Sequence, residues 1–451
     1  MSIFDGKRLD KSVFQIDVER MRRGWYSDAY FANTVTILQT LAEEGYTFQG
    51  ESLIELPAPS TVPIGDLVVE MQIFTRRRPY ALVAGVDEAL AILESCTGYF
   101  AADGSFVSTY DQLEVEAVHD GVFVYYRGDS LNVQPVLKIR GRYRDFAQLE
   151  TPILGALTEA TRIATNVYEV LAAARGKDLL FFPARFAHYK LQALHGYAYS
   201  LAVQAYNHTH GTNSHIFVST DDQAGWWGGR GGGTIAHASI ACFLGDTLET
   251  MLQFCRIMPT DVPRIVLVDF ENDCVGTTLR VMKGMFEQYL RLHRANEPNQ
   301  AARYRLYGVR PDTSGNMRDV SVTPLGEKHL DMGVNPRLVW LLRQAIDQAY
   351  LDWNLEDEEL DMARHWCQDV KIVATGGFTA EKISRFEELD VPVDVYGVGS
   401  SLLENCTASG SKSDYTADIV RVLIDGSWYP LAKEGRRACD NPDLMQVKNQ
   451  K

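Results

Sequence analysis

The chain has 451 residues, a formal net charge of −15 at pH 7, and 46% hydrophobic and 23% charged residues. This composition indicates a folded globular protein, and the negative charge argues against broad binding to nucleic acid phosphates. Because no apolar stretch reaches the roughly 18 residues of a membrane span and no secretion signal is apparent at the N-terminus, we expect a cytoplasmic protein.

The first 150 residues show a mixed helix and strand pattern. A helix is predicted over residues 30–44, where it ends before Gly45. Strands are predicted over residues 67–74, 115–118, 122–126 and 136–139. In the tail, strands at 418–424 and 428–431 are joined by Asp425-Gly426, a pair typical of a hairpin turn. We expect the tail to pack back on the N-terminal region.

From about residue 150 the pattern changes to strands that alternate with helices. Short apolar strands are predicted at 264–270, 305–310, 370–375 and 393–398, and helices at 276–294, 336–350 and 379–389. Such alternation predicts a parallel sheet, as a barrel or as a doubly wound sheet. Each strand ends in polar or glycine residues, and active sites of such folds lie at the carboxyl ends of the strands. Polar and glycine residues at the ends of all four strands would lie on one rim, and this favours the barrel over the doubly wound sheet.

These patterns predict an α/β protein with two domains. An N-terminal sheet domain would span residues 1–148, with residues 406–451 packed back on it, and an α/β barrel would span residues 149–405.

His237 is the first candidate for chemistry. It follows the glycine-rich run 228–234 and stands at the head of an apolar, helix-like segment. A neutral imidazole nitrogen is a nucleophile that can accept a phosphoryl group, and amides at a helix start favour anions. The alternatives are a flexible turn and a histidine with only a structural hydrogen bond.

A second candidate is Arg310-Pro311-Asp312, at the end of a predicted strand. Arginine can bind phosphate through two hydrogen bonds, and aspartate can hold a ribose hydroxyl or a water on Mg²⁺. A surface ion pair in a turn is the alternative reading.

Two glycine pairs follow successive predicted strands: Gly376-Gly377, and then Gly397 and Gly399 with Ser400. Backbone amides at such positions can approach a phosphate closely. A phosphate site after the last strands is common in barrels.

Taken in order, the motifs resemble those of the type II phosphoribosyltransferases, and among them the nicotinate phosphoribosyltransferase family in its archaeal-like branch. The matching segments run through most of the chain: 27–31, 182–185, 211–214, 233–237, 267–269, 308–312, 374–378, 395–400 and 415–420.

This resemblance implies an irregular, TIM-like α/β barrel with a smaller mixed α+β sheet domain, in a homodimer whose active sites combine residues of both subunits. The implied reaction joins nicotinate to 5-phosphoribosyl diphosphate, which gives nicotinate mononucleotide and diphosphate in NAD salvage. ATP hydrolysis would be coupled through phosphorylated His237, and Mg²⁺, near Asp269, would neutralise the diphosphate.

The resemblance also implies roles for individual residues. Phe182 and Tyr30 would stack on the pyridine ring, with Tyr30 and Asp28 supplied by the neighbouring subunit, and Arg185 would contact the ring substituent. Further substrate contacts are implied at Thr212 and Asn213.

At the sugar, Asp312 would bind the ribose hydroxyls and Arg310 the nucleotide or diphosphate. The phosphate would lie on the amides of Gly376, Gly377, Gly397, Gly399 and Ser400. Two alternatives remain: transfer to nicotinamide or another small aromatic base, and a catalytically silent nucleotide-binding regulator.

Overall fold

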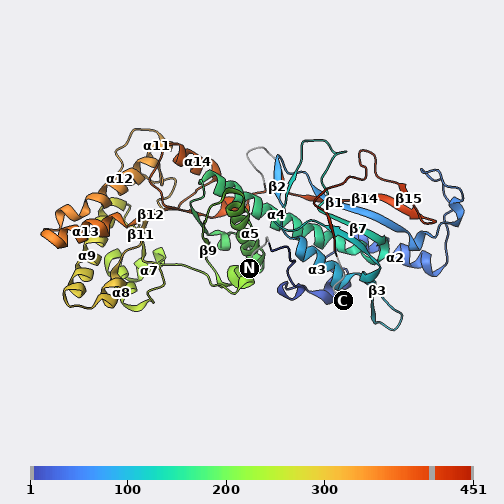
Figure 1. Cartoon of the computed structure of the whole chain (residues 1–451), viewed down its shortest axis with the longest axis horizontal. Coiled ribbons are helices and arrows are strands. Elements are labelled where there is room, and N and C mark those ends of the chain that lie inside the picture. The colour runs from blue at the N-terminus through green and yellow to red at the C-terminus, as the bar shows by residue number, and fades with distance from the viewer. Residues whose placement is uncertain (1–4, 406–411, 448–451) are drawn as a thin grey trace. The chain divides into compact units, whose positions relative to one another are not determined.

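The computed structural model describes residues 5–405 and 412–447 (Figure 1). The chain forms two compact units. The first comprises Met1–Asn166, Tyr197–Ala205 and Glu404–Lys451, and the second comprises Val167–Gly196 and Tyr206–Leu403. Tail residues 406–411 and 448–451, which were expected to pack on the N-terminal domain, lie outside the described residues. The domain boundary at residue 148 stays a prediction.

The second unit is built on a six-stranded parallel sheet in the order β10-β11-β12-β13-β8-β9. Its strands are β8 (Asp178–Phe181), β9 (Ile216–Val218), β10 (Ile265–Leu267), β11 (Gly308–Arg310), β12 (Lys371–Ala374) and β13 (Val395–Val398). No pairing between β9 and β10 is recorded among the described residues, so the ring of strands is irregular. The expected α/β architecture is confirmed, and the four strands predicted from residue 264 onward all form.

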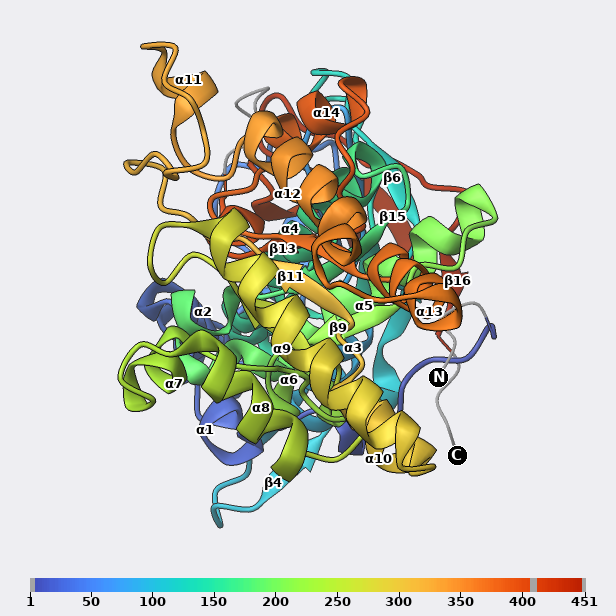
Figure 2. The same cartoon turned by 90° about the vertical axis from the view of Figure 1, so that its left-hand side faces the viewer.

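Helices surround this sheet. They are α6 (Asp221–Ala224), α7 (His237–Cys242), α8 (Thr247–Ile257), α9 (Cys274–Arg294), α10 (Pro298–Ala301), α11 (Lys328–Asp331), α12 (Pro336–Gln348), α13 (Asp357–Gln368) and α14 (Ala380–Glu388). In Figure 2, α8 lies beside α9, and α9 also contacts α12. Side-chain caps at Asp246, Asp273, Asn335 and Thr379 each accept a backbone N–H of the first turn, which fixes where α8, α9, α12 and α14 begin.

The first unit contains an antiparallel sheet in the order β15-β14-β1-β7-β5-β16. Its strands are β1 (Val68–Thr75), β5 (Glu114–Ala117), β7 (Leu137–Arg142), β14 (Tyr415–Ile424), β15 (Ser427–Pro430) and β16 (Met445–Gln446). Two further two-stranded antiparallel sheets pair β2 (Tyr80–Leu82) with β6 (Phe123–Tyr125) and β3 (Gly98–Phe100) with β4 (Phe106–Ser108). The tail thus supplies strands to the N-terminal sheet, as the sequence predicted.

The helices of this unit are α1 (Val18–Arg22), α2 (Ala29–Glu43) and α3 (Val86–Cys96). Two long helices, α4 (Glu150–Ala173) and α5 (Gln192–His210), carry residues of both units. The turn between β14 and β15 has Asp425 and Gly426 at φ of 48° and 78°, which is the geometry that the hairpin prediction required. No helix among the described residues has the length and apolar character needed to cross a membrane.

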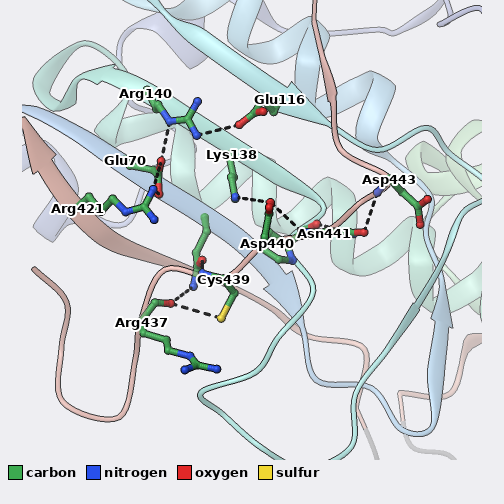
Figure 3. Close-up of polar contacts among 12 residues, drawn as sticks. Glu70, Glu116, Lys138, Arg140, Arg421, Arg437, Cys439, Asp440, Asn441 and Asp443 are labelled. Carbon is green, nitrogen blue, oxygen red and sulfur yellow. Dashed lines mark hydrogen bonds and ion pairs between the residues drawn. The ribbon is translucent and has the colours of Figure 1, made fainter. Parts of the chain in front are cut away.

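Charged side chains hold the antiparallel sheet together (Figure 3). Glu70 of β1 is 1% exposed and binds two arginines from its neighbours, Arg140 of β7 at 2.6 Å and Arg421 of β14 at 3.1 Å. Arg140 also pairs with Glu116 at 3.0 Å. Because a buried carboxylate is stable only when it is paired and hydrogen-bonded, these contacts join three strands around one charge.

Beyond β15, the tail runs back along the sheet and then forms β16. Lys138 binds Asp440 at 2.9 Å (Figure 3). Asn441 donates to the carbonyl of Pro135 at 2.9 Å. The side chain of Gln72 donates to Arg437 and accepts the N–H of Cys439. These contacts connect the tail to β1, to β7 and to the residues just before β7.

Candidate active site

His237 and Asp269 form a pair. His237 is the first residue of α7, and Asp269 lies two residues beyond the end of β10. The histidine Nε2 lies 3.1 and 3.2 Å from the two carboxylate oxygens. Its side chain is 45% exposed, whereas that of Asp269 is 10% exposed. Burial raises the pKa of Asp269 above its usual value, His237 opposes that rise, and nearby Asp312 adds to it.

Asp312 follows β11 and is held by the next strand in the sheet. The hydroxyl of Thr375, after β12, donates to Asp312 Oδ1 at 2.8 Å. The Oδ1 atom is also 3.3 Å from the position that a Cβ on Gly376 would take, so Gly376 leaves room for the carboxylate. Its φ of +93° is a second reason for glycine at this position.

Arg310, the last residue of β11, lies near the carboxylates of Asp312 and Asp269 and also near the ring of Phe182. Burial lowers the pKa of its guanidinium, Asp312 and Asp269 oppose that shift, and Arg185 adds to it. The buried Nε of Arg310 has no hydrogen-bond partner. Its guanidinium carbon lies 5.8 Å from the ring centre of Phe182. This buried donor is therefore available for a hydrogen bond to a bound ligand.

Two aromatic rings explain two of the glycines. A Cβ on Gly397 would lie 2.9 Å from the ring of Phe182, and a Cβ on Gly399 would lie 2.8 Å from the ring of Phe186. Phe186 in turn lies under the guanidinium of Arg185, at 5.2 Å. The structure therefore gives these glycines a packing role next to the rings, while their contact with phosphate stays a prediction.

Free backbone amides gather after β12 and β13. Within the described residues, the N–H groups of Gly376, Gly377, Gly399 and Ser400 donate to no recorded acceptor. Gly377, like Gly376, has a positive φ, of 64°. Amides without partners at the ends of two adjacent parallel strands are suited to an anion.

Thr212 and Asn213 lie elsewhere. They precede β9, and the adjoining residues Ser214 and His215 bond to Gly176 and Asp178 at the start of β8. This turn therefore lies at the amino ends of β8 and β9, whereas Arg310 and Thr375 lie at carboxyl ends. The structure does not bring Thr212 and Asn213 together with the other predicted site residues.

A turn that was not among the predicted site residues does follow the carboxyl end of β9. It contains Thr220, which caps α6, and Asp221, which accepts the N–H of Gly231 at 2.8 Å. Its signal was the hydroxyl and carboxylate residues directly after an apolar strand. Phe186 and Thr375 were also missed, although they adjoin the predicted site residues Arg185 and Gly376.

Asp28 and Tyr30 belong to the first unit, at the start of α2. The Tyr30 hydroxyl donates to Asp28 Oδ2 at 3.0 Å, and this bond raises the pKa of Tyr30. Tyr30 is 61% exposed. Their contribution to the site of a neighbouring subunit stays a prediction.

Comparison with known proteins supports the same architecture. Residues 58–161 match the family described as quinolinate phosphoribosyl transferase, N-terminal domain. Nicotinate-nucleotide pyrophosphorylase from Pyrococcus furiosus has a similar crystal structure, with a TM-score of 0.59 and 24% sequence identity over 94% of this chain and 81% of that one. Human nicotinic acid phosphoribosyltransferase matches with a TM-score of 0.54 and 16% identity, over 88% and 74% of the two chains. The chain thus shares the fold of these two enzymes, and residues 58–161 of its first unit match the quinolinate phosphoribosyl transferase N-terminal domain family.

Proposed function

We propose that this protein is a phosphoribosyltransferase that joins nicotinate to 5-phosphoribosyl diphosphate and gives nicotinate mononucleotide and diphosphate, in NAD synthesis. The observation that supports this most directly is that one rim of the parallel sheet, here called the reaction rim, carries the His237–Asp269 pair, Arg310 and Asp312. The same rim carries the loop at Gly376-Gly377, here called the Gly376 loop.

The pyridine ring would stack on Phe182, and the two arginines beside it would hold its carboxylate. Arg185 is close enough that its charge helps to lower the pKa of Arg310. Two neighbouring cations repel each other and attract an anion that lies between them. The unpartnered Nε of Arg310 supplies one of the donors for this anion.

The sugar and its phosphate would occupy the space beyond Arg310. The free amides of Gly376, Gly377, Gly399 and Ser400 would hold the 5-phosphate, and Asp312, fixed by Thr375, would accept hydrogen bonds from the ribose hydroxyls. Displacement at the anomeric carbon develops positive charge on the sugar ring. Preorganised carboxylates and phosphate donors stabilise such a state and align the two reactants.

ATP coupling would use the free nitrogen of His237. Its Nε2 faces Asp269 at 3.1 Å, so the carboxylate favours the tautomer with the proton on Nε2 and the lone pair on Nδ1. Nδ1 would attack the γ-phosphorus of ATP, the bond from that phosphorus to the β-γ bridging oxygen would break, and ADP would leave. Asp269 would stabilise the positive charge of the imidazole.

The carboxylates of the rim would hold Mg²⁺ only together with ligands from the substrate and from water. The described residues contain no group of three or more His, Cys, Asp or Glu side chains that could hold a metal ion on their own. The charge of Asp312 helps to raise the pKa of Asp269, and Mg²⁺ commonly takes one or two carboxylates together with substrate phosphates and waters. Mg²⁺ bound this way would neutralise charge on the diphosphate.

The test is direct. Purified protein is incubated with 5-phosphoribosyl diphosphate, Mg²⁺ and carbon-labelled nicotinate, nicotinamide or quinolinate, each with and without ATP, and mononucleotides are separated by chromatography. We expect nicotinate to react fastest and ATP to raise its rate. If none of the three bases yields a mononucleotide, the proposed transferase is wrong and a silent nucleotide-binding regulator is favoured.

Quinolinate is included because residues 58–161 match a domain of the enzymes that are named for it. Its two carboxylates would need two cations, and Arg185 and Arg310 offer two. If quinolinate reacts fast and ATP has no effect on the rate, quinolinate and not nicotinate is the substrate.

A further inference from the structure

A cavity of about 640 Å³ lies in the second unit, next to the Gly376 loop. Neither the proposed base site nor the proposed phosphate site uses it. Cationic side chains of Lys328, Lys382 and Arg385 line it, and so do the apolar side chains of Met332, Val334 and Phe386. Its volume is within the range of roughly 300–1,000 Å³ that is usual for small-molecule sites.

Lys382 is the most informative residue of the cavity. Its ammonium group donates to the carbonyl of Gly376 at 3.1 Å and lies 4.1 Å from the ring centre of Phe378. Burial lowers its pKa to about 8. No ion pair with Lys382 is recorded among the described residues. A partly buried ammonium group without a counter-ion is unfavourable, and a bound anion would relieve this.

The other charges of the cavity are more exposed. Arg385 lies three residues after Lys382 on α14, where side chains share a face, while Lys328 donates to Asn316 Oδ1 at 3.2 Å. The carboxylates of Glu327 and Glu381 also line the cavity, and Glu327 lies 3.9 Å from His329. Lys382 and Arg385, on one helix face, are therefore the pair that is free to bind an anion.

We propose that this cavity is a second ligand site, which binds a nucleotide with its phosphate on Lys382 and Arg385 and its ring against Met332, Val334 and Phe386. The two kinds of lining residue match the two halves of such a ligand. Because Lys382 also holds the carbonyl of Gly376, a nucleotide bound here would act on the loop that carries the free amides. The site does not depend on the proposed transferase reaction.

Adenosine 5′-monophosphate is the probe, and isothermal titration calorimetry of the whole chain at pH 8 is the measurement. Titrations in two buffers of different ionisation enthalpy give the number of protons taken up. Since the pKa of Lys382 is near the working pH, an anion that raises it should cause uptake of about half a proton. Inorganic phosphate, which lacks the ring, should bind more weakly.

Four variants locate the site. We expect K382M and R385A each to weaken nucleotide binding at least tenfold, and K382M to abolish the proton uptake. K283M makes the same change as K382M at an exposed position of α9, and R310M changes the reaction rim. Both should bind the nucleotide as the wild type does.

The opposite pattern would overturn the proposal. Binding that is unaffected by R385A, or that is lost in R310M, would place the nucleotide on the reaction rim or on the Gly376 loop. R385A matters because Arg385 is exposed and can be replaced without disturbing Gly376. No turnover is measured, so a protein without transferase activity can still pass this test, and an active transferase can fail it.

Discussion

At the scale of single residues, the His237–Asp269 pair joins an exposed imidazole to a buried carboxylate. The exposed ring can reach a substrate, while burial keeps the carboxylate in place and raises its pKa. This division suits a nucleophile and the group that orients it. Neither residue type alone indicated such a partnership.

Replacing His237 with alanine tests the ATP coupling. We expect H237A to keep transfer from nicotinate in the absence of ATP but to lose all stimulation by ATP, because no nitrogen remains to take the phosphoryl group. Initial rates with and without ATP measure this. H293A, at an exposed histidine of α9, is the matched control. An ATP response that persists in H237A would remove His237 from the coupling.

Gly397 allows a second test at this scale. A Cβ there would lie 2.5 Å from Thr375 Cγ2 and 2.9 Å from the Phe182 ring, so G397A must displace one of them. We expect the KM for the base to rise by about tenfold or more, because these side chains position the ring and Asp312. G315A, where a Cβ would meet nothing within 4 Å, is the control. Unchanged KM in G397A would mean that the ring of Phe182 does not position the base.

At the scale of elements, the loops that follow β10 and β11 are bonded to each other. The buried carboxylate of Asp319 accepts the N–H of Cys274 and that of Ser321, each at 2.9 Å. Asn272 donates to the carbonyl of Arg318 and accepts the N–H of Val320. These bonds fix the distance between the loops that carry Asp269 and Asp312.

Asp319 should therefore act as a positioning residue. We expect D319A to lower kcat by about tenfold or more while the KM for nicotinate changes little, because the carboxylates shift and the base site does not. Loss of a buried acceptor should also lower the free energy of unfolding by about 1–3 kcal/mol. Steady-state kinetics and urea denaturation measure the two effects, with D361A as the surface control. Lower stability with an unchanged kcat would show a purely structural role.

At the scale of the whole molecule, the architecture was predictable and parts of the site were not. The barrel strands are apolar runs that end in polar residues, and the hairpin at Asp425-Gly426 has a distinctive turn pair, so their patterns are local. The sequence does not show which end of a three-residue strand a turn joins. Substrate contacts of Thr212 and Asn213 were implied by the resemblance alone, which did not show that their turn lies at the amino ends of β8 and β9. The packing of Gly397 against Phe182, and the contact between Lys382 and Gly376, join distant segments and leave no local pattern.

The predicted homodimer can be tested by restoring activity between two inactive variants. If Asp28 and Tyr30 complete the site of a neighbouring subunit, two inactive variants can restore each other. We expect Y30A and D312A proteins to have low activity separately and to regain activity when they are coexpressed, because a mixed dimer then contains one intact site. Recovery is measured as the rate per milligram of purified mixed protein. If coexpression restores nothing although mixed dimers form, the two residues serve the site of their own chain or none.

The account depends most on the reaction rim, where Asp312 and the free amides of the Gly376 loop would form the site for the sugar phosphate next to the base site at Arg310. The most direct test is the rate of nicotinate mononucleotide formation in the wild type, in D312N and in D361N, which makes the same change on the surface. We predict formation by the wild type and D361N, and a loss on the order of 100-fold in D312N. Equal rates in all three proteins would contradict the account.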